Sequence, residues 1–527
     1  HGGREIVSRT TEGSTIRTTW GEVRSRAKRL ASALAARGIG LGDRIATLAW
    51  NTHRHLEVYY GVSGMGAVCH TLNPRLHPSQ LTYILNHAAD RVLFLEPTFI
   101  PLVEAVLDDL ESLEACVVLC DGREPPASRL PGLVAYEAFI DGHGDADPWP
   151  VLDELTAASL CYTSGTTGNP KGALYTHRST VLHAYGVVQP DVFDLGRNDV
   201  VLPVVPMFHA NAWGLPYAAA AVGAKIVFPG PRLDPAGLTE QFEAEGVTMS
   251  AGVPSVFIQL VQYWKKEGIQ RPGTLEFLVI GGSAPPRSLM ESLEGDFGIR
   301  VRHAWGMTEM SPLGTANVLS REQAALPPQE RSQYHMKQGQ PPFGVEVRVV
   351  DEHGARLPHD GVTFGELQVR GPWVVDGYFK VDEQKLTPDG WFPTGDVATL
   401  DESCCVQITD RTKDLIKSGG EWISSIDVEN AAMGHPQITM AAVIGVPHEK
   451  WGERPLLIAV PASSPPPEPE EVREYLRGSL ADWQLPDRIV WVDELPLGAT
   501  GKVQKSKLRE RYAREHATGG AEAAARA

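Results

Sequence analysis

The chain has 527 residues, of which 42% are apolar, 21% charged and 7% aromatic, and its formal charge is −17 at pH 7. This length is too great for one hydrophobic core and predicts two or more domains, while the composition excludes a globally disordered chain. The negative charge argues against a dedicated nucleic-acid binder, although a locally basic pocket for a small polyanion stays possible.

Helical and strand-like segments alternate through the first two thirds of the chain. Apolar residues recur at helical spacing over residues 20–37, and Gly38 follows as a C-cap. In chain order we then predict a strand at 44–49, a helix at 55–67, and strands at 92–95, 116–119, 158–161, 200–203, 225–228 and 277–280. This alternation favours an α/β fold with layered, mostly parallel sheets.

The pattern changes at Glu346, where short strands with turn signals predict a smaller β-rich subdomain over segments 346–350, 365–369 and 391–392. After Asp410 helices and strands alternate again over about a hundred residues, which is enough for a small domain. We therefore expect an N-terminal domain over residues 1–410, made of layered α/β subdomains and the β-rich one. A small α+β C-terminal domain is expected over residues 411–527.

Cysteine usage and hydropathy indicate the compartment. No cysteine pair has zinc-site spacing, and Cys404 and Cys405 are sequence neighbours, so we expect reduced thiols and a cytoplasmic protein. No apolar run reaches the roughly 18 residues that span a bilayer. The chain begins at His1 without a methionine, which leaves open a native start further upstream, and no charged, apolar leader is visible in it.

The sharpest local feature is the glycine-rich segment 162–172, YTSGTTGNPKG. Its glycines allow close backbone approach, its hydroxyls and amides can surround phosphate oxygens, and Lys171 supplies a cation. It differs from the common P-loop, because Pro170 stands where that motif has its second glycine. A flexible linker would need no such order before a lysine, so we interpret the segment as a phosphate-binding loop.

Segment 163–172 resembles the phosphate loop of the adenylate-forming superfamily, which includes acyl-CoA synthetases, adenylation domains and firefly-type luciferases. Further similar segments follow in the expected order: GGSA at 281–284, AWGMTE at 304–309, TGD at 394–396, DRTKDLIKSGG at 410–420 and TGK at 500–502. Segments 205–213 and 417–425 make the chain most similar to bacterial medium- and long-chain fatty acyl-CoA ligases.

The resemblance implies an ATP-dependent acid–CoA ligase, with a fatty acid as the expected substrate. The carboxylate attacks the α-phosphate of ATP and pyrophosphate leaves; the coenzyme A thiol then displaces AMP from the acyl-AMP. Negative charge builds up on the phosphate during the first step, so cations are the main requirement. ATP, Mg²⁺ and coenzyme A are the expected cofactors, and a mobile C-terminal domain would present a different face at each step.

The resemblance also assigns roles to individual residues. Thr163 and Glu309 are expected to bind Mg²⁺, and Lys502 to act in the acyl–phosphate step. Asp396 is expected to accept both ribose hydroxyls, supported by Arg411. The remaining predicted nucleotide contacts are Ser164, Gly165, Thr166, Thr167, Gly168, Lys171, Gly282, His303, Ala304, Thr308, Lys413 and Lys417.

Several of these assignments have a plainer alternative. Glu309 alone could be a surface glutamate, a single histidine such as His303 is often structural, and Lys413 with Lys417 could form a solvated basic stripe. His209, Trp213 and Trp422 are expected to border the acyl site, although a tryptophan more commonly packs in a core.

One segment departs from the family pattern. The family usually has an Asp-x-x-Gly-aromatic turn before the hinge that we expect at residues 410–415, whereas this chain has Asp401-Glu402-Ser403 followed by Cys404 and Cys405. Loss of the glycine removes easy access to positive φ, so we expect a turn of another type.

Two rival functions remain open. The adenylate could pass to an amine, nitrite or a carrier-protein thiol in a biosynthetic pathway, in place of coenzyme A. The chain could also be a nucleotide-binding regulator without catalysis, but every charged catalytic position is present. The sequence leaves the acid, and a possible homodimer, undetermined.

Overall fold

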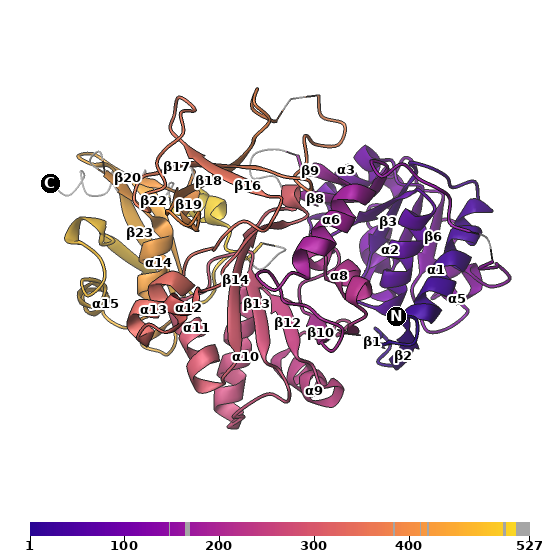
Figure 1. The fold of residues 1–527 in the computed structure, drawn as a ribbon, viewed down its shortest axis with the longest axis horizontal. Helices are drawn as coiled ribbons and strands as arrows, with labels where there is room; N and C mark the ends of the chain where they lie inside the picture. The colour runs from indigo at the N-terminus through magenta and orange to yellow at the C-terminus, as the bar shows by residue number, and fades with distance from the viewer. Residues whose placement is uncertain are drawn as a thin grey trace.

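The computed structural model describes residues 1–146, 148–163, 169–382, 385–411, 413–418, 421–498 and 502–512. In these ranges the chain forms four sheets, of eight, seven, four and five strands (Figure 1). Helices cover the two larger sheets, and the indigo N-terminal part lies on the right of the elongated molecule, with the orange-to-yellow C-terminal unit on the left. No helix in the described ranges is long and apolar enough to cross a membrane.

The seven-stranded sheet has the order β7-β6-β5-β3-β4-β8-β9 and is parallel except for its β8–β9 hairpin. Its strands are β3 (Arg44–Leu48), β4 (Val68–Thr71), β5 (Val92–Leu95), β6 (Ala115–Val118), β7 (Val134–Ala135), β8 (Ala157–Thr163) and β9 (Lys171–Thr176). The helical segments of this region are α1 (Trp20–Ala35), α2 (His53–Gly64), α3 (Pro78–Ala88), η1 (Pro97–Phe99), α4 (Ile100–Glu104), η2 (Leu107–Asp109), α5 (Tyr136–Phe139) and α6 (His177–Val187).

Helix α1 shows how the local sequence sets an element. Thr19 caps its N-terminus by accepting a hydrogen bond from the backbone of Glu22. The apolar residues at helical spacing form its buried face, which packs against α2: Val23, Ala27, Leu30 and Leu34.

The eight-stranded sheet has the order β15-β14-β13-β12-β10-β11-β1-β2 and is parallel except at its two edges. Its strands are β1 (Glu5–Arg9), β2 (Thr15–Thr19), β10 (Val200–Pro203), β11 (Lys225–Phe228), β12 (Met249–Gly252), β13 (Phe277–Gly281), β14 (Arg300–Gly306) and β15 (Leu313–Ala316). The helical segments here are α7 (Ala210–Trp213), α8 (Leu215–Val222), α9 (Pro235–Glu245), α10 (Pro254–Glu267), α11 (Arg287–Glu291), η3 (Ser292–Asp296), η4 (Thr308–Met310), α12 (Arg321–Ala324) and α13 (Pro328–His335).

A four-stranded antiparallel sheet forms the predicted β-rich subdomain, from β16 (Glu346–Val350), β17 (Phe364–Arg370), β18 (Phe392–Leu400) and β19 (Val406–Arg411). The turn between β18 and β19 differs from its prediction. Cys404 itself adopts φ +60°, in place of a glycine. The Asp401 carboxylate accepts hydrogen bonds from the backbone of Ser403 and Cys405, both at 3.0 Å, and stabilises the turn.

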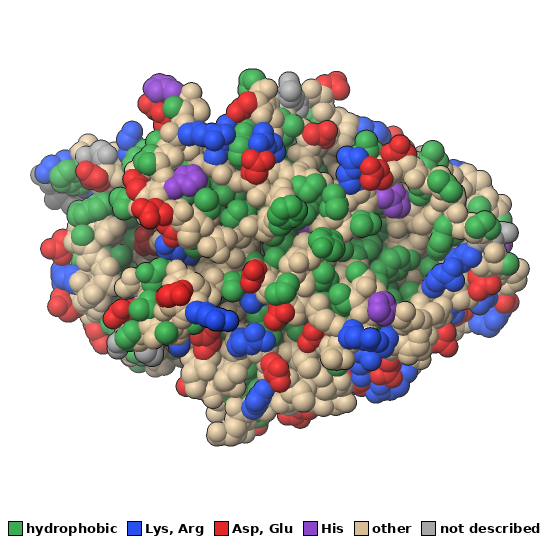
Figure 2. Space-filling view, in the orientation of Figure 1, with side chains coloured by type: hydrophobic (Ala, Val, Ile, Leu, Met, Phe, Trp, Pro, Cys, Tyr) green, Lys and Arg blue, Asp and Glu red, His purple; other side chains and the backbone are tan. Residues whose placement is uncertain are grey.

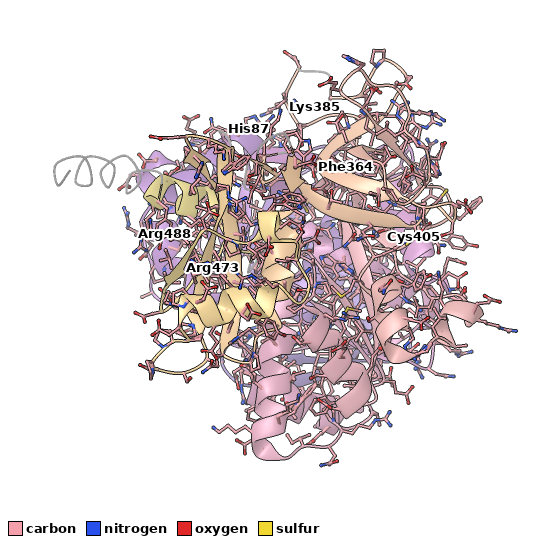
Figure 3. All side chains as sticks on the ribbon, turned by 90° about the vertical axis from the view of Figure 1, so that its left-hand side faces the viewer. His87, Phe364, Lys385, Cys405, Arg473 and Arg488 are labelled. Carbon is pink, nitrogen blue, oxygen red and sulfur yellow. The ribbon has the colours of Figure 1, made fainter. Side chains whose placement is uncertain are left out.

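The C-terminal unit is built on β20 (Ile416–Ser418), β21 (Glu421–Ile423), β22 (Ile438–His448), β23 (Gly452–Pro461) and β24 (Arg488–Trp491), with α14 (Ser425–Met433), α15 (Pro469–Leu476) and η5 (Asp482–Gln484). Its own core includes Val428, Val443 and Leu457. From the side, the C-terminal unit with Arg473 and Arg488 lies next to the four-stranded sheet, which carries Phe364 (Figure 3).

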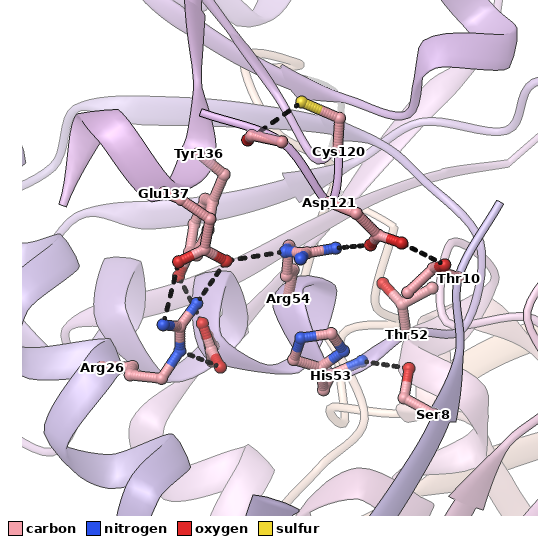
Figure 4. A network of polar contacts seen from close by, with 12 residues as sticks. Ser8, Thr10, Arg26, Thr52, His53, Arg54, Cys120, Asp121, Tyr136 and Glu137 are labelled. Carbon is pink, nitrogen blue, oxygen red and sulfur yellow. Dashed lines mark hydrogen bonds and ion pairs between the residues drawn. The ribbon is translucent and has the colours of Figure 1, made fainter. Parts of the chain in front are cut away.

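A partly buried polar network, in which Glu57 and Arg54 are the most buried charged members, joins the first two helices to the end of the seven-stranded sheet (Figure 4). Arg26 bonds Glu57 and Glu137, each at 2.8 Å, and Arg54 bonds Glu137 and Asp121, each at 3.0 Å. Burial raises the pKa of Glu57, and the Arg26 guanidinium opposes that rise. The paired charges make this interior position tolerable for the carboxylates.

The seven-stranded and eight-stranded sheets confirm the mostly parallel α/β layering that was predicted from the alternation of helices and strands. Predicted strands 92–95, 200–203 and 225–228 coincide with β5, β10 and β11. The β1–β2 hairpin was not predicted; its strands alternate weakly, and β1 acquires its burial only by pairing with the distant β11.

Candidate active site

A cavity of about 1270 Å³ lies where the two large sheets, the four-stranded sheet and the C-terminal unit meet. The space-filling view shows apolar side chains gathered near the middle of one face, where Figure 1 places α6 and α8 (Figure 2). The described site residues that the sequence predicted and that line the cavity are Thr163, Lys171, His209, Trp213, Gly282, Ala304, Thr308, Glu309, Asp396, Arg411, Lys413 and Lys502. They come from positions up to 339 residues apart, so folding has assembled one site from separate motifs.

The predicted phosphate loop begins and ends at this cavity. Thr163 ends β8 and pairs directly with Lys171, the first residue of β9. Lys171 Nζ lies 5.2 Å from the centre of the Tyr378 ring, a cation–π contact. Ser164, Gly165, Thr166, Thr167 and Gly168 lie outside the described residues.

The carboxylate of Glu309 is buried at one wall of the cavity, on the 3₁₀ turn η4 that follows β14. Tyr378 donates a hydrogen bond to Glu309 Oε1 at 2.6 Å, and the backbone of Val375 donates to the Glu309 carbonyl at 2.8 Å. Burial raises the pKa of Glu309, because removal from water disfavours the charged form. A cation in the cavity would favour the ionised carboxylate again.

Asp396 and Arg411 face each other across neighbouring strands. They are paired in the register of β18 and β19, and Arg411 Nε lies 3.3 Å from Asp396 Oδ1. Trp305 donates its indole N–H to the other oxygen of Asp396 at 3.0 Å. Each carboxylate oxygen has two acceptor positions, so Asp396 keeps capacity for two hydroxyl donors.

Lys502 enters the same cavity from the C-terminal unit and lies beside Gly282. Gly282 has φ +83°, and a Cβ there would meet Val253 Cγ1 at 3.1 Å, so only glycine fits this wall easily. Removal from water, reinforced by Arg411, lowers the pKa of Lys502 to about 8, while Asp396 and Glu309 act in the opposite sense.

A backbone turn of unusual handedness leads to Trp213, which lines the cavity. Ala210, Asn211, Ala212 and Trp213 have φ of 43°, 52°, 49° and 55°, and Gly214 continues the run with φ 76°. Left-handed conformation costs about 1–2 kcal/mol per non-glycine residue. The turn places Trp213 against Gly281 and the cavity, while burial lowers the pKa of His209 to about 4.

Three predicted site residues do not line this cavity. His303 is buried within β14, where burial lowers the pKa of its imidazole to about 4. Lys417 and Trp422 line a separate cavity of about 480 Å³, with Lys417 Nζ 5.2 Å from the Trp422 ring centre. In this arrangement Trp422 therefore does not join Trp213, and the roles of these three residues stay predictions.

Sequence reasoning missed Tyr378 and gave Trp305 no role. Tyr378 contacts both Glu309 and Lys171, and Trp305 contacts Asp396. Trp305 belongs to the segment 304–309 that contains Thr308 and Glu309, so its position in this motif is a sequence signal for a place in the site. Tyr378 lies in an irregular segment whose pattern carries no comparable signal.

Comparison with known proteins decides the family. The model of the AMP-binding enzyme family matches residues 1–379, and the model of the AMP-binding enzyme C-terminal domain matches residues 427–502. The chain belongs to the AMP-binding enzyme family. The predicted membership of the adenylate-forming superfamily is thereby confirmed.

Individual relatives support this conclusion along almost the whole chain. A 3-methylmercaptopropionyl-CoA ligase from Ruegeria lacuscaerulensis is 53% identical, over 97% of this chain and 95% of the relative. A medium-chain-fatty-acid–CoA ligase from Ectopseudomonas oleovorans is 49% identical, over 97% and 94%. The crystal structure of ATP-bound MatB from Rhodopseudomonas palustris matches with a TM-score of 0.80 at 26% identity, over 97% of this chain and 96% of that one.

This member of the AMP-binding enzyme family is an ATP-dependent, AMP-forming acyl-CoA ligase, so the prediction of an enzyme is confirmed. Its cavity holds cationic groups (Lys171, Arg411, Lys502) next to two carboxylates (Glu309, Asp396). Such a set can bind a nucleotide and offset the charge that develops when a carboxylate attacks the α-phosphate.

The lowered pKa of Lys502 predicts an alkaline limit for acyl-AMP formation by the ligase. Below pH 8 the ammonium is protonated and can stabilise negative charge; as the pH rises through about 8 that charge is lost. We expect kcat/KM for ATP, which reports groups of the free enzyme, to fall tenfold per pH unit above this value. Pyrophosphate release measured across neutral and alkaline pH checks the profile. The residual activity of Lys502→Ala should lack this fall, and an unchanged alkaline limit in that variant would contradict the assignment.

Proposed function

We propose that the ligase is a fatty acyl-CoA synthetase: it couples an apolar carboxylic acid to AMP with Mg²⁺ and ATP, and transfers the acyl group to coenzyme A. The observation that carries this proposal is the apolar part of the cavity lining, which includes Phe193, Phe208, Trp213 and Ile258. Trp213 and Lys502 both lie near Gly282 in this cavity, so an acid with an apolar chain could place its carboxylate beside Lys502 while removing the chain from water.

We infer that Mg²⁺ is bound through Glu309 and the hydroxyl of Thr163, because both groups face the cavity and are hard oxygen ligands. In the described part of the chain there is no group of three or more histidine, cysteine, aspartate or glutamate side chains that could hold a metal. This donor set fits an ion that completes its coordination with water and substrate phosphates, as Mg²⁺ ordinarily does. The metal would supply positive charge at the α-phosphate.

The names of the relatives favour two kinds of acid. One relative is named for a medium-chain fatty acid and the other for the 3-methylmercaptopropionyl group. A screen of pyrophosphate release should therefore cover short, medium, long and aryl acids together with 3-methylmercaptopropionate. Each acid is tested with and without coenzyme A, and the thioester is measured directly. We expect the highest kcat/KM with an aliphatic fatty acid, and the proposal fails if aryl or only very short acids are preferred.

Trp213→Ala tests whether this tryptophan forms the end of the acyl site. We expect the variant to change the chain-length preference while KM for ATP stays unchanged, because only the acyl side of the cavity is enlarged. Chain-length profiles of kcat/KM provide the measurement. Trp264→Ala is the matched control, because Trp264 is fully buried away from the cavity. It should lose about 3–5 kcal/mol of stability with an unchanged profile; the same outcome for Trp213→Ala would favour a packing role.

We further infer that residues 411–527 form a mobile domain that rotates about the segment after Asp410. The two family models fall on either side of this segment, and the four-stranded sheet ends there at Arg411. A cytoplasmic location and a homodimer stay predictions from the sequence.

A further inference from the structure

The left-handed turn at α7 needs an interaction that holds it, because three of its four residues are alanine or tryptophan, which rarely adopt this conformation. Asn211 is the exception: asparagine tolerates left-handed φ better than other residues that carry a side chain. It has φ 52° and ψ 44°, and its side chain is only 3% exposed. The turn therefore has one residue that both suits its backbone and points into the protein.

The side-chain amide of Asn211 is bonded to the strand that leads to the phosphate loop. Its Nδ2 donates to Ser159 Oγ at 2.9 Å, and its Oδ1 accepts from Cys161 Sγ at 3.2 Å. Both partners lie on β8, two residues apart, so they project from the same face of the strand. Strand β8 ends at Thr163, so this amide joins the turn to the strand that carries a predicted metal ligand.

Two residues further on, Trp213 packs against the end of β13. If Gly281 carried a Cβ atom, that atom would stand 3.3 Å from Cη2 of Trp213, so the ring lies tightly against this glycine. The ring also lies near Gly282, and Lys502 lies beside the same glycine. The orientation of Trp213 depends on the turn, because a right-handed turn would direct the side chain elsewhere.

We propose that Asn211 is a positioning residue: its amide holds the left-handed turn on β8, and the turn in turn fixes Trp213 as the wall that selects the acid. This inference rests on the proposed role of Trp213 in acid selection. Asn211 itself is not among the residues that line the cavity, so it acts through Trp213.

Asn211→Gly is the sharpest variant, because glycine keeps the left-handed backbone freely while the amide contacts are lost. We expect the ratio of kcat/KM for a medium-chain acid to that for a short acid to change roughly tenfold, in the same direction as in Trp213→Ala. KM for ATP should stay within about twofold of the unaltered ligase. In the Trp213→Ala background, Asn211→Gly should change the ratio by about twofold or less, because the effects of substitutions at coupled residues do not add.

Two further variants keep the test decisive. Ser159→Ala removes the acceptor of the Asn211 Nδ2 hydrogen bond and should shift the preference in the same direction. It replaces Asn211→Gly if that variant does not fold. Asn317→Ala is the matched control, because it removes a different asparagine amide that lies away from the cavity. Asn317 Nδ2 donates to the backbone carbonyls of Tyr334 and Lys337, at 2.7 and 2.6 Å. This control should leave the preference unchanged.

The outcomes separate the two proposals. If Trp213→Ala changes the preference but Asn211→Gly and Ser159→Ala do not, the positioning role is wrong and the role of Trp213 stands. The positioning role would also be wrong if Asn211→Gly changed the preference equally in the unaltered ligase and in the Trp213→Ala variant, because Asn211 would then act independently of Trp213. If Trp213→Ala leaves the preference unchanged, the proposed acyl wall is wrong and the inference about Asn211 fails with it.

Discussion

Lys502→Ala is expected to separate the two half-reactions of the ligase. The lysine lies in the cavity with Glu309, Asp396 and Arg411, and its proposed role is to neutralise charge between the carboxylate and the α-phosphate. We expect acyl-AMP formation, measured as pyrophosphate release, to slow by roughly 10²-fold or more. Thioester formation from supplied acyl-AMP should stay close to that of the unaltered ligase, because the proposed rotation of residues 411–527 would carry Lys502 out of the site before coenzyme A enters.

The control for this experiment is Lys225→Ala, which removes a partly buried lysine that is ion-paired to Glu5 and Glu245 away from the cavity. It should affect both steps equally and slightly. Equal, large damage to both steps in Lys502→Ala would mean that the lysine supports folding or docking of the C-terminal unit, and the proposed one-step role would be wrong.

Glu309→Gln is expected to have a comparable effect through the metal. The substitution keeps the size of the side chain and can keep the hydrogen bond from Tyr378, but it removes the charge that would hold Mg²⁺. Pyrophosphate release at saturating acid and ATP should fall by roughly 10²-fold or more. The apparent Mg²⁺ requirement, measured by titration, should rise.

Glu294→Gln offers a matched comparison, because burial raises the pKa of Glu294 as well and this residue lies outside the cavity. We expect its Mg²⁺ titration to match that of the unaltered ligase. Near-normal turnover of Glu309→Gln at saturating Mg²⁺ would show that the metal ligand lies elsewhere.

Site residues were predictable from the sequence when they stand in a short motif, because the chemistry there requires a particular residue type at a particular position. Thr163, Glu309, Asp396 and Lys502 each stand in a short motif, and the structure brings all four to one cavity. The α/β layering was predictable for a related reason: strands buried in parallel sheets are continuous apolar runs.

The rest depends on contacts between distant segments. Tyr378 reaches Glu309 from 69 positions away. The left-handed turn contains no glycine before Gly214, so its backbone could not be read from local propensity; the bonds from Asn211 to β8 override that propensity. Cys404 likewise takes positive φ because Asp401 stabilises the turn around it.

The partly buried network around Arg26 limits the amino-acid substitutions that this chain can accept at these positions. Two arginines share three carboxylates there, and removal of one partner strands an interior charge at a cost of about 3–5 kcal/mol. That loss is comparable to the whole stability of a small domain. We therefore expect replacement of Arg26 alone to destabilise the fold, because Glu57 is fully buried, and exchange of both Arg26 and Glu57 for a well-packed apolar pair to cost less. In homologous sequences the residues at positions 26 and 57 should accordingly change together. Such covariation would indicate that the two side chains pack together, and would carry no information about the substrate.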